Sequence, residues 1–113
     1  MTLPKAARLL RRREFLTVQQ RGRKLYAGDV LVLALEAGRA RPRLGITVSS
    51  KIANAVGRNR VKRWVREAFR AVQGALPPVD LVVIARRGAP EMGLEGARRA
   101  LDAARSALAG ALP

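Results

Sequence analysis

The sequence predicts an α+β sandwich, in which helices cover a small β-sheet, and three observations lead to this class. Two apolar runs rich in β-branched residues, 29–36 and 80–86, are typical of strands. Residues 43–50 alternate apolar with small or polar side chains, the period of a strand with one buried face. Residues 61–72 repeat apolar side chains every three or four positions, the period of an amphipathic helix. Strands and helices of this kind bury their apolar faces against one another.

The length and charge of the chain limit its organisation and its partners. The 113 residues suffice for one domain with a modest core, which we assign to residues 1–113, and no linker divides them. Lys and Arg number 23 against 8 acids, a net charge of +15, which favours nucleic acid or anionic membrane as a partner. No apolar run is long enough to span a bilayer, and no apolar segment follows the N-terminal bases as in a secretion signal. We therefore expect a cytoplasmic protein.

The residues that are missing exclude several kinds of chemistry. The chain has no cysteine and no histidine, which excludes disulfides, zinc sites of the Cys/His type, thiol nucleophiles and imidazole bases. The eight acids are scattered singly, without the paired carboxylates that hold metal ions in nucleases. We expect no catalytic residue and no metal ligand in this chain.

The N-terminal half contains an arm, a short helix and three strands in this interpretation. Residues 1–11 are basic and aperiodic, as in a flexible arm, and a helix is expected over 12–20, ending before Gly22. Phe15 on that helix is either a core residue or part of a binding surface. An edge strand is expected from Lys24, and the strands 29–36 and 43–50 are expected to form a hairpin across the turn 37–42.

The C-terminal half contains two helices around the last strand. A connector over 50–57 leads into the basic helix, which ends at Gly74 and the prolines that follow it. After the strand 80–86, Pro90 and Glu91 suit the first turn of a final helix. Its apolar stripe, from Leu94 to Leu108, is expected to cover the sheet.

The basic helix carries the strongest functional signal. Its cations recur every four residues in one row, and a second, shorter row runs beside it: Arg58, Lys62, Arg66 and Arg70, then Arg60 and Arg63. Like charges at this spacing destabilise a helix by a few tenths of a kcal/mol per pair, roughly. A polyanionic partner would compensate this repulsion. The alternative is that the charged face is only solvated.

The same stretch resembles a known family. Residues 51–66, KIANAVGRNRVKRWVR, are similar to the signature of the bacterial ribonuclease P protein subunit, and weaker similarity extends to Arg8, Phe15 and 80–86. The resemblance implies an αβββαβα two-layer sandwich with a mixed sheet, as in the second domain of ribosomal protein S5. It also implies a left-handed crossover for the basic helix, whereas the general rule for parallel strands is right-handed.

The function implied by the resemblance is removal of the 5′ leader from precursor tRNA. In this family a catalytic RNA subunit with bound Mg²⁺ carries out the chemistry, so the expected partners are that RNA and precursor tRNA, with no membrane, no further protein and no metal on the protein itself. Residues implied to bind the leader, in a cleft between the basic helix and the sheet, are Phe15, Leu31, Leu33, Thr47, Ser49, Arg58, Asn59, Lys62 and Arg66. Residues implied to contact the catalytic RNA are Lys51, Arg60, Arg63 and Arg70.

The chain departs from the family pattern in its aromatic residues. Gln19 and Leu33 stand where the family often has aromatics, so the cleft is expected to depend more on charge than on stacking. Trp64 stands where an aliphatic residue is usual, and its place on the apolar stripe predicts a core role. Asn59 could instead cap the start of the helix. The alternative function is that of a ribosomal or other structural RNA-binding protein without turnover.

Overall fold

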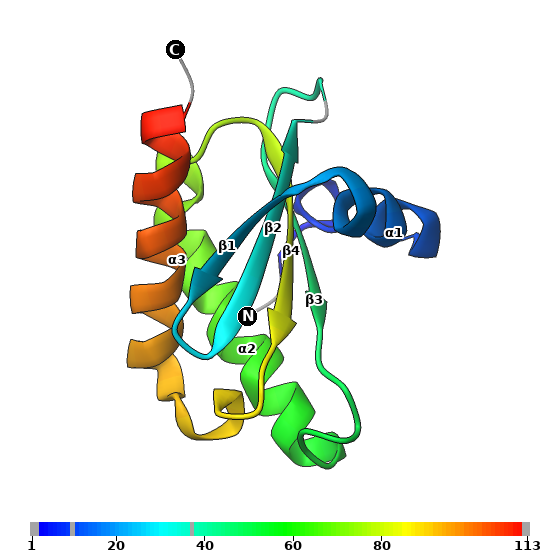
Figure 1. The fold of residues 1–113 in the computed structure, drawn as a ribbon, viewed down its shortest axis with the longest axis vertical. Coiled ribbons are helices and arrows are strands. Elements are labelled where there is room, and N and C mark those ends of the chain that lie inside the picture. Colours follow the sequence, from blue (N-terminus) through cyan, green and yellow to red (C-terminus); the bar gives the residue numbers. More distant parts are fainter. Residues whose placement is uncertain (1–2, 10, 37, 112–113) are drawn as a thin grey trace.

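The computed structural model describes residues 3–9, 11–36 and 38–111, and in these residues three α-helices pack around a four-stranded sheet (Figure 1). The elements follow the predicted αβββαβα order: α1 (Arg12–Arg21), β1 (Arg23–Ala27), β2 (Val30–Glu36), β3 (Arg43–Thr47), α2 (Ala55–Val72), β4 (Val79–Ala85) and α3 (Gly93–Ala111). Three short 3-10 turns complete the fold: η1 (Lys5–Ala7) precedes α1, η2 (Gln73–Ala75) follows α2, and η3 (Ala89–Glu91) precedes α3. The predicted α+β class and mixed sheet are confirmed.

The strand order shows that one predicted pairing is wrong. The order is β1-β2-β4-β3, with β2 antiparallel to both neighbours and β3 parallel to β4, so β4 separates the two strands that we expected to form a hairpin. Every residue of β4 except Ile84 is buried, which suits a central position in the sheet. The hairpin instead joins β1 to β2 through Gly28 and Asp29, where Gly28 has the left-handed φ of 58° that such a two-residue turn requires.

The connection from β3 to β4 has the unusual hand that the resemblance implied. In Figure 1 both strands run down the page with β3 to the right of β4, and α2 returns behind the sheet. A path that passes behind the strands in this order is left-handed, against the general preference for right-handed crossovers.

The two faces of the sheet have separate apolar clusters. On one face, α2 and α3 cover the larger cluster, which includes Val32, Val65, Phe69 and Leu101. Trp64 packs against this cluster, as its position on the helical stripe predicted. On the other face, α1 covers a smaller cluster of Leu9, Val18, Leu33 and Val82. Because α1 is only ten residues long, it covers only part of that face.

The N-terminal segment is docked on the sheet, contrary to the expectation of a loosely held arm. Leu3 and Leu9 are buried, Arg8 forms a parallel bridge with Leu44 of β3, and the Leu9 N–H donates to the Leu44 carbonyl at 3.0 Å. β3 is an edge strand, and the segment occupies part of its free hydrogen-bonding side. Pairing of this kind leaves no periodic pattern in so short a segment.

Both long helices begin at positions that differ from the prediction. The Asn54 side chain accepts a hydrogen bond from the Gly57 N–H at 2.9 Å, so α2 begins at Ala55 and Asn59 is not its cap. Pro90 lies in η3 rather than in the first turn of α3, because α3 begins only at Gly93, which has a left-handed φ of 68°. No helix in the described part of the chain has the length and apolarity needed to cross a membrane.

Candidate nucleic-acid interface

A cleft at the β3 edge brings together residues from three elements. Phe15 of α1, Gly45 of β3, and Lys62 and Arg66 of α2 line a cavity of about 170 Å³, together with Arg8 and buried apolar neighbours. α1 and α2 lie on opposite faces of the sheet, so the two cations reach the cleft around the edge strand. An aromatic ring beside two cations can hold a nucleotide by its base and its phosphate.

The position of Phe15 depends on a glycine in β3. A Cβ atom at Gly45 would lie 2.6 Å from Phe15 Cε2 and 2.7 Å from Cζ, closer than carbon atoms approach in proteins. The ring therefore lies directly on the β3 backbone, half-buried against the smaller apolar cluster. The core role and the binding role that the sequence left open are both compatible with this position.

The predicted row of cations on α2 is divided by the structure. Lys62 and Arg66 are half-buried at the cleft, whereas Arg70 is exposed further along the helix. Arg58 donates from Nη1 to the Ala53 carbonyl at 3.0 Å, so part of its hydrogen-bonding capacity holds the connector. In the described part of the chain, no carboxylate lies within 4.0 Å of any cation of this row. Their charge is available to an external anion.

Beyond α1, one row of the sheet remains open. Thr47, Ile84, Leu31 and Tyr26 are successive register partners across β3, β4, β2 and β1, and they lie on the face opposite α2 and α3. The first three are half-buried and Tyr26 is 68% exposed. The structure thus places two predicted site residues, Thr47 and Leu31, on an accessible surface.

Leu33 does not belong to that surface. It lies on the predicted face of β2, but only 2% of it is exposed, because α1 packs over this level of the sheet. The expectation that Leu33 forms an accessible wall of the cleft is wrong. It is a core residue that supports α1.

Three residues of the interface were missed in the sequence: Tyr26, Arg86 and Arg8. The Arg86 guanidinium lies over the Tyr26 ring, 5.5 Å from its centroid, which forms an exposed aromatic and cationic pair. Alternation along β1 could have indicated Tyr26, because its neighbours Leu25 and Ala27 pack into the larger cluster. Arg8 lines the cleft from the docked N-terminal segment, and no local pattern indicated that docking.

The remaining predicted residues are exposed. Arg60, Arg63 and Asn59 lie exposed on α2, and Lys51 and Ser49 lie in the connector that precedes it. The Ser49 hydroxyl accepts a hydrogen bond from the Lys51 N–H at 3.1 Å, so it also shapes this loop. The structure therefore leaves these residues accessible without joining them to the cleft.

The acids near the site form a structural network with Arg43. Asp80 is buried and accepts two hydrogen bonds from Arg43, at 2.9 Å from Nε and 2.8 Å from Nη2. Arg43 Nη1 also donates to Glu14 of α1 at 3.0 Å. The hydrogen bond with Asp80 raises the pKa of Arg43 above its already high value, so the arginine remains charged. Among the described residues, no group of three His, Cys, Asp or Glu could hold a metal ion.

A mixed sheet with a left-handed crossover, an aromatic cleft and a large excess of unpaired cations defines a small RNA-binding protein of the α+β class. Comparison with known proteins specifies the family. The family model described as "Ribonuclease P" matches residues 3–108. The chain belongs to the ribonuclease P protein family, so it is the protein component of the ribonuclease P endoribonuclease, functions in tRNA 5′ processing and associates with ribonuclease P RNA.

Relatives and solved structures agree with this assignment. The chain is 46% identical to the ribonuclease P protein component of Chlamydia trachomatis serovar D over 87 residues, which cover 76% of this chain and 72% of that protein. It is 38% identical to the Shouchella clausii ribonuclease P protein component over 102 residues, which cover 88% of this chain and 84% of that protein. The Thermotoga maritima ribonuclease P protein superposes with a TM-score of 0.79 at 36% identity, covering 88% of this chain and 96% of that one. The Staphylococcus aureus ribonuclease P protein superposes with a TM-score of 0.79 at 31% identity, covering 88% of this chain and 92% of that one. These matches favour the ribonuclease P function over the structural RNA-binding alternative.

Proposed function

We propose that this chain binds the single-stranded 5′ leader of precursor tRNA in the cleft at the β3 edge, while the RNA subunit performs the hydrolysis with Mg²⁺ that it holds itself. The observation that carries the proposal is the convergence of Phe15, Lys62 and Arg66 on one cavity. The lack of a carboxylate cluster in the described residues is consistent with chemistry carried by the RNA. The protein acts in the cytoplasm and needs no further protein partner.

The leader is bound by charge at the cleft and by stacking at two places. Lys62 and Arg66 contact its phosphates, and Phe15 stacks on a base, an interaction worth about 1–3 kcal/mol in single-strand binders. The RNA leader then crosses the open row of the sheet past Thr47 and Leu31. At the far edge, the pair of Tyr26 and Arg86 offers a second stacking place. This second place replaces the aromatics that the family often has at the positions of Gln19 and Leu33.

The other exposed predicted residues complete the interface at its margins. Asn59 and Ser49 lie next to the leader. Arg58 does too, with the guanidinium N–H groups that are not bonded to the Ala53 carbonyl. The RNA subunit contacts the exposed cations of the connector and α2, which are Lys51, Arg60, Arg63 and Arg70. Phosphate contacts by such cations release counterions, so binding weakens steeply with salt.

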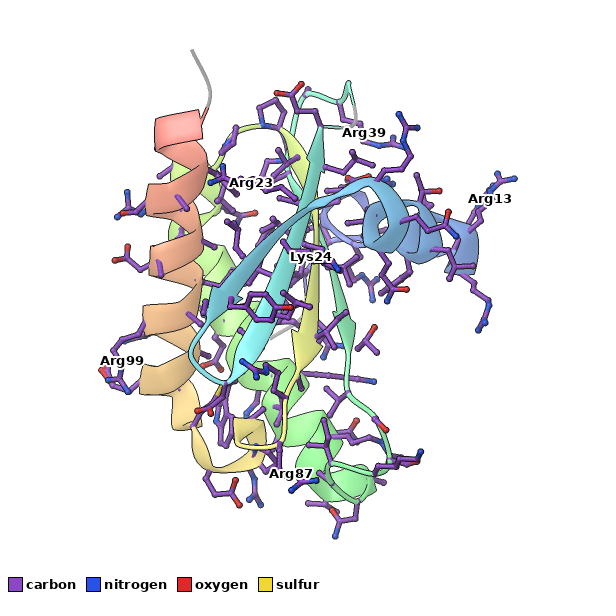
Figure 2. All side chains as sticks on the ribbon, in the orientation of Figure 1. Arg13, Arg23, Lys24, Arg39, Arg87 and Arg99 are labelled. Carbon is purple, nitrogen blue, oxygen red and sulfur yellow. The ribbon has the colours of Figure 1, made fainter. Side chains whose placement is uncertain are left out.

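Reconstitution with the RNA subunit tests this function. The holoenzyme is assembled with the wild-type chain, Arg66→Ala or Arg99→Ala. Cleavage of precursor tRNA is followed at low Mg²⁺, and the affinity of each holoenzyme for precursor and for mature tRNA is measured. Arg99 is an exposed arginine on α3, so its substitution controls for the loss of one positive charge (Figure 2). We expect Arg66→Ala to weaken binding of precursor more than of mature tRNA and Arg99→Ala to change neither. Equal losses for both RNAs with Arg66→Ala would remove this residue from the leader site.

A further inference from the structure

A second cavity, larger than the cleft, lies between the docked N-terminal segment, the start of α1 and the loop before β3. Its volume is about 590 Å³, and seven basic side chains and one acidic side chain line it. We call it the arginine pocket. Five of its bases are Lys5, Arg8, Arg11, Arg13 and Arg41. All seven lie outside α2, so the pocket is distinct from the basic rows of that helix.

The acids around the arginine pocket neutralise only two of its seven bases. Glu14 lies 3.0 Å from Arg43 and 3.7 Å from Arg39, and its carboxylate also accepts the Arg11 backbone N–H at 3.2 Å. Asp80 pairs with Arg43 from the other side. Within the ranges that the structure describes, the five other bases have no carboxylate within 4.0 Å. The pocket therefore concentrates positive charge in a concave surface, which raises the local concentration of anions.

Arg8 gives the pocket an unsatisfied donor. Its side chain lines both the arginine pocket and the leader cleft, and its Nε is buried without a hydrogen-bond acceptor in the structure. In folded proteins a buried donor of this kind normally has a partner. Guanidinium groups match the oxygens of a phosphate in pairs, and the pocket offers several from separate segments of the chain.

We propose that the arginine pocket binds phosphates of an RNA backbone, as a contact separate from α2. The proposal rests on the proposed function, because that function supplies both RNAs that could provide the phosphates: the RNA subunit and a long leader. In Figure 2, Arg13 and Arg39 lie beside α1, and Arg87 lies in the lower part of the view, away from α1. An RNA held here and at α2 would be bound by two groups of cations from different elements of the fold.

Substitution of two exposed pocket arginines tests the proposal. Arg11→Ala with Arg41→Ala removes two unpaired cations and keeps the backbone hydrogen bond from residue 11 to Glu14. The matched control is Arg98→Ala with Arg99→Ala, which removes two exposed cations from α3. Circular dichroism establishes that both variants fold. Affinity is measured over a range of salt for the RNA subunit alone, and for holoenzyme with precursors that carry short or long leaders.

We expect the pocket variant to bind more weakly than the control variant, with a salt slope lower by about one for each phosphate that it no longer binds. Weaker binding of the RNA subunit alone supports the proposal with that RNA as the source of the phosphates. Weaker binding confined to precursors with long leaders supports it with the leader as the source. Affinities and slopes equal to those of the control variant for every RNA would overturn it.

The same assay separates this proposal from the leader site. Arg66→Ala reports on the cleft and the arginine pair reports on the pocket, so each can fail alone. If Arg66→Ala weakens precursor binding while the pocket variant behaves as the control, only the pocket proposal is overturned. If Arg66→Ala has no effect on precursor binding but the pocket variant weakens binding of the RNA subunit, the leader site fails and the pocket stands.

Discussion

The substitution Asp80→Asn tests the buried ion pair that joins β3 to β4. Asp80 and Arg43 are register partners with two hydrogen bonds of 2.9 and 2.8 Å, and their side chains are only 8% and 12% exposed. Removing one member of a buried pair costs about 3–5 kcal/mol, because the other charge is left without compensation. Arg43 keeps its bond to Glu14, which places the expected loss at the lower end, about 3 kcal/mol. At about 4 °C per kcal/mol, Tm falls by roughly 12 °C.

The assay is thermal unfolding followed by circular dichroism, with Asp102→Asn as the matched control. Asp102 pairs with Arg105 at 2.8 Å on α3, but the two side chains are 61% and 33% exposed. Exposed pairs of this kind contribute about 0–1 kcal/mol, so the control should lower Tm by at most a few degrees, roughly. If Asp80→Asn lowers Tm no more than Asp102→Asn, burial does not make this pair important, and our reasoning is refuted.

Three further predictions concern RNA binding and the cleft. Tyr26→Ala should weaken binding of long-leader precursors by the equivalent of about 1–3 kcal/mol, whereas Tyr26→Phe, which keeps the ring, should not. Stacking is measured with a fluorescent base analogue in the leader. If both variants lose its signal equally, the hydroxyl and not the ring makes the contact. Gly45→Ala should displace the Phe15 ring, which lowers the free energy of unfolding in urea by about 1–3 kcal/mol and weakens precursor binding. Gly74→Ala, at a position with no atom within 4 Å of the added Cβ, should change neither quantity. Equal effects of the two substitutions would contradict the close packing at Gly45. Arg60→Ala and Arg63→Ala should each lower the salt slope for the RNA subunit by about one, and an unchanged slope would exclude a phosphate contact.

Local periodicity predicted most of the elements of this fold. The alternation over 43–50 and the helical stripe with Trp64 correspond to β3 and to the face of α2 that packs on the sheet. These patterns arise from contacts that each element makes with a single apolar layer, so they are visible within one segment. The composition likewise indicated a nucleic-acid partner, and the motif over 51–66 indicated the family.

Features that depend on distant segments could not be predicted in this way. The hairpin prediction was wrong because β4 lies between β2 and β3 in the sheet. The sequences of β2 and β3 contain no pattern that indicates a third strand between them. Leu33 is on the expected face, but its accessibility depends on where α1 packs. Arg8 reaches the cleft only because its segment docks on the edge of β3. In each case the decisive contact lies far away in the sequence.

The central place of β4 also determines when the protein can fold during its synthesis. β2 and β3 have no pairing with each other, so the sheet joins them only after residues 79–85 have left the ribosome. Until then the nascent chain carries apolar strands with unpaired edges, a state that is prone to aggregation. The buried pair of Arg43 and Asp80 cannot form earlier either. A chain interrupted before β4 therefore contains the residues of the basic helix but lacks the strand that holds β3 in the sheet. Such a chain would bind RNA through its positive charge alone, without selectivity.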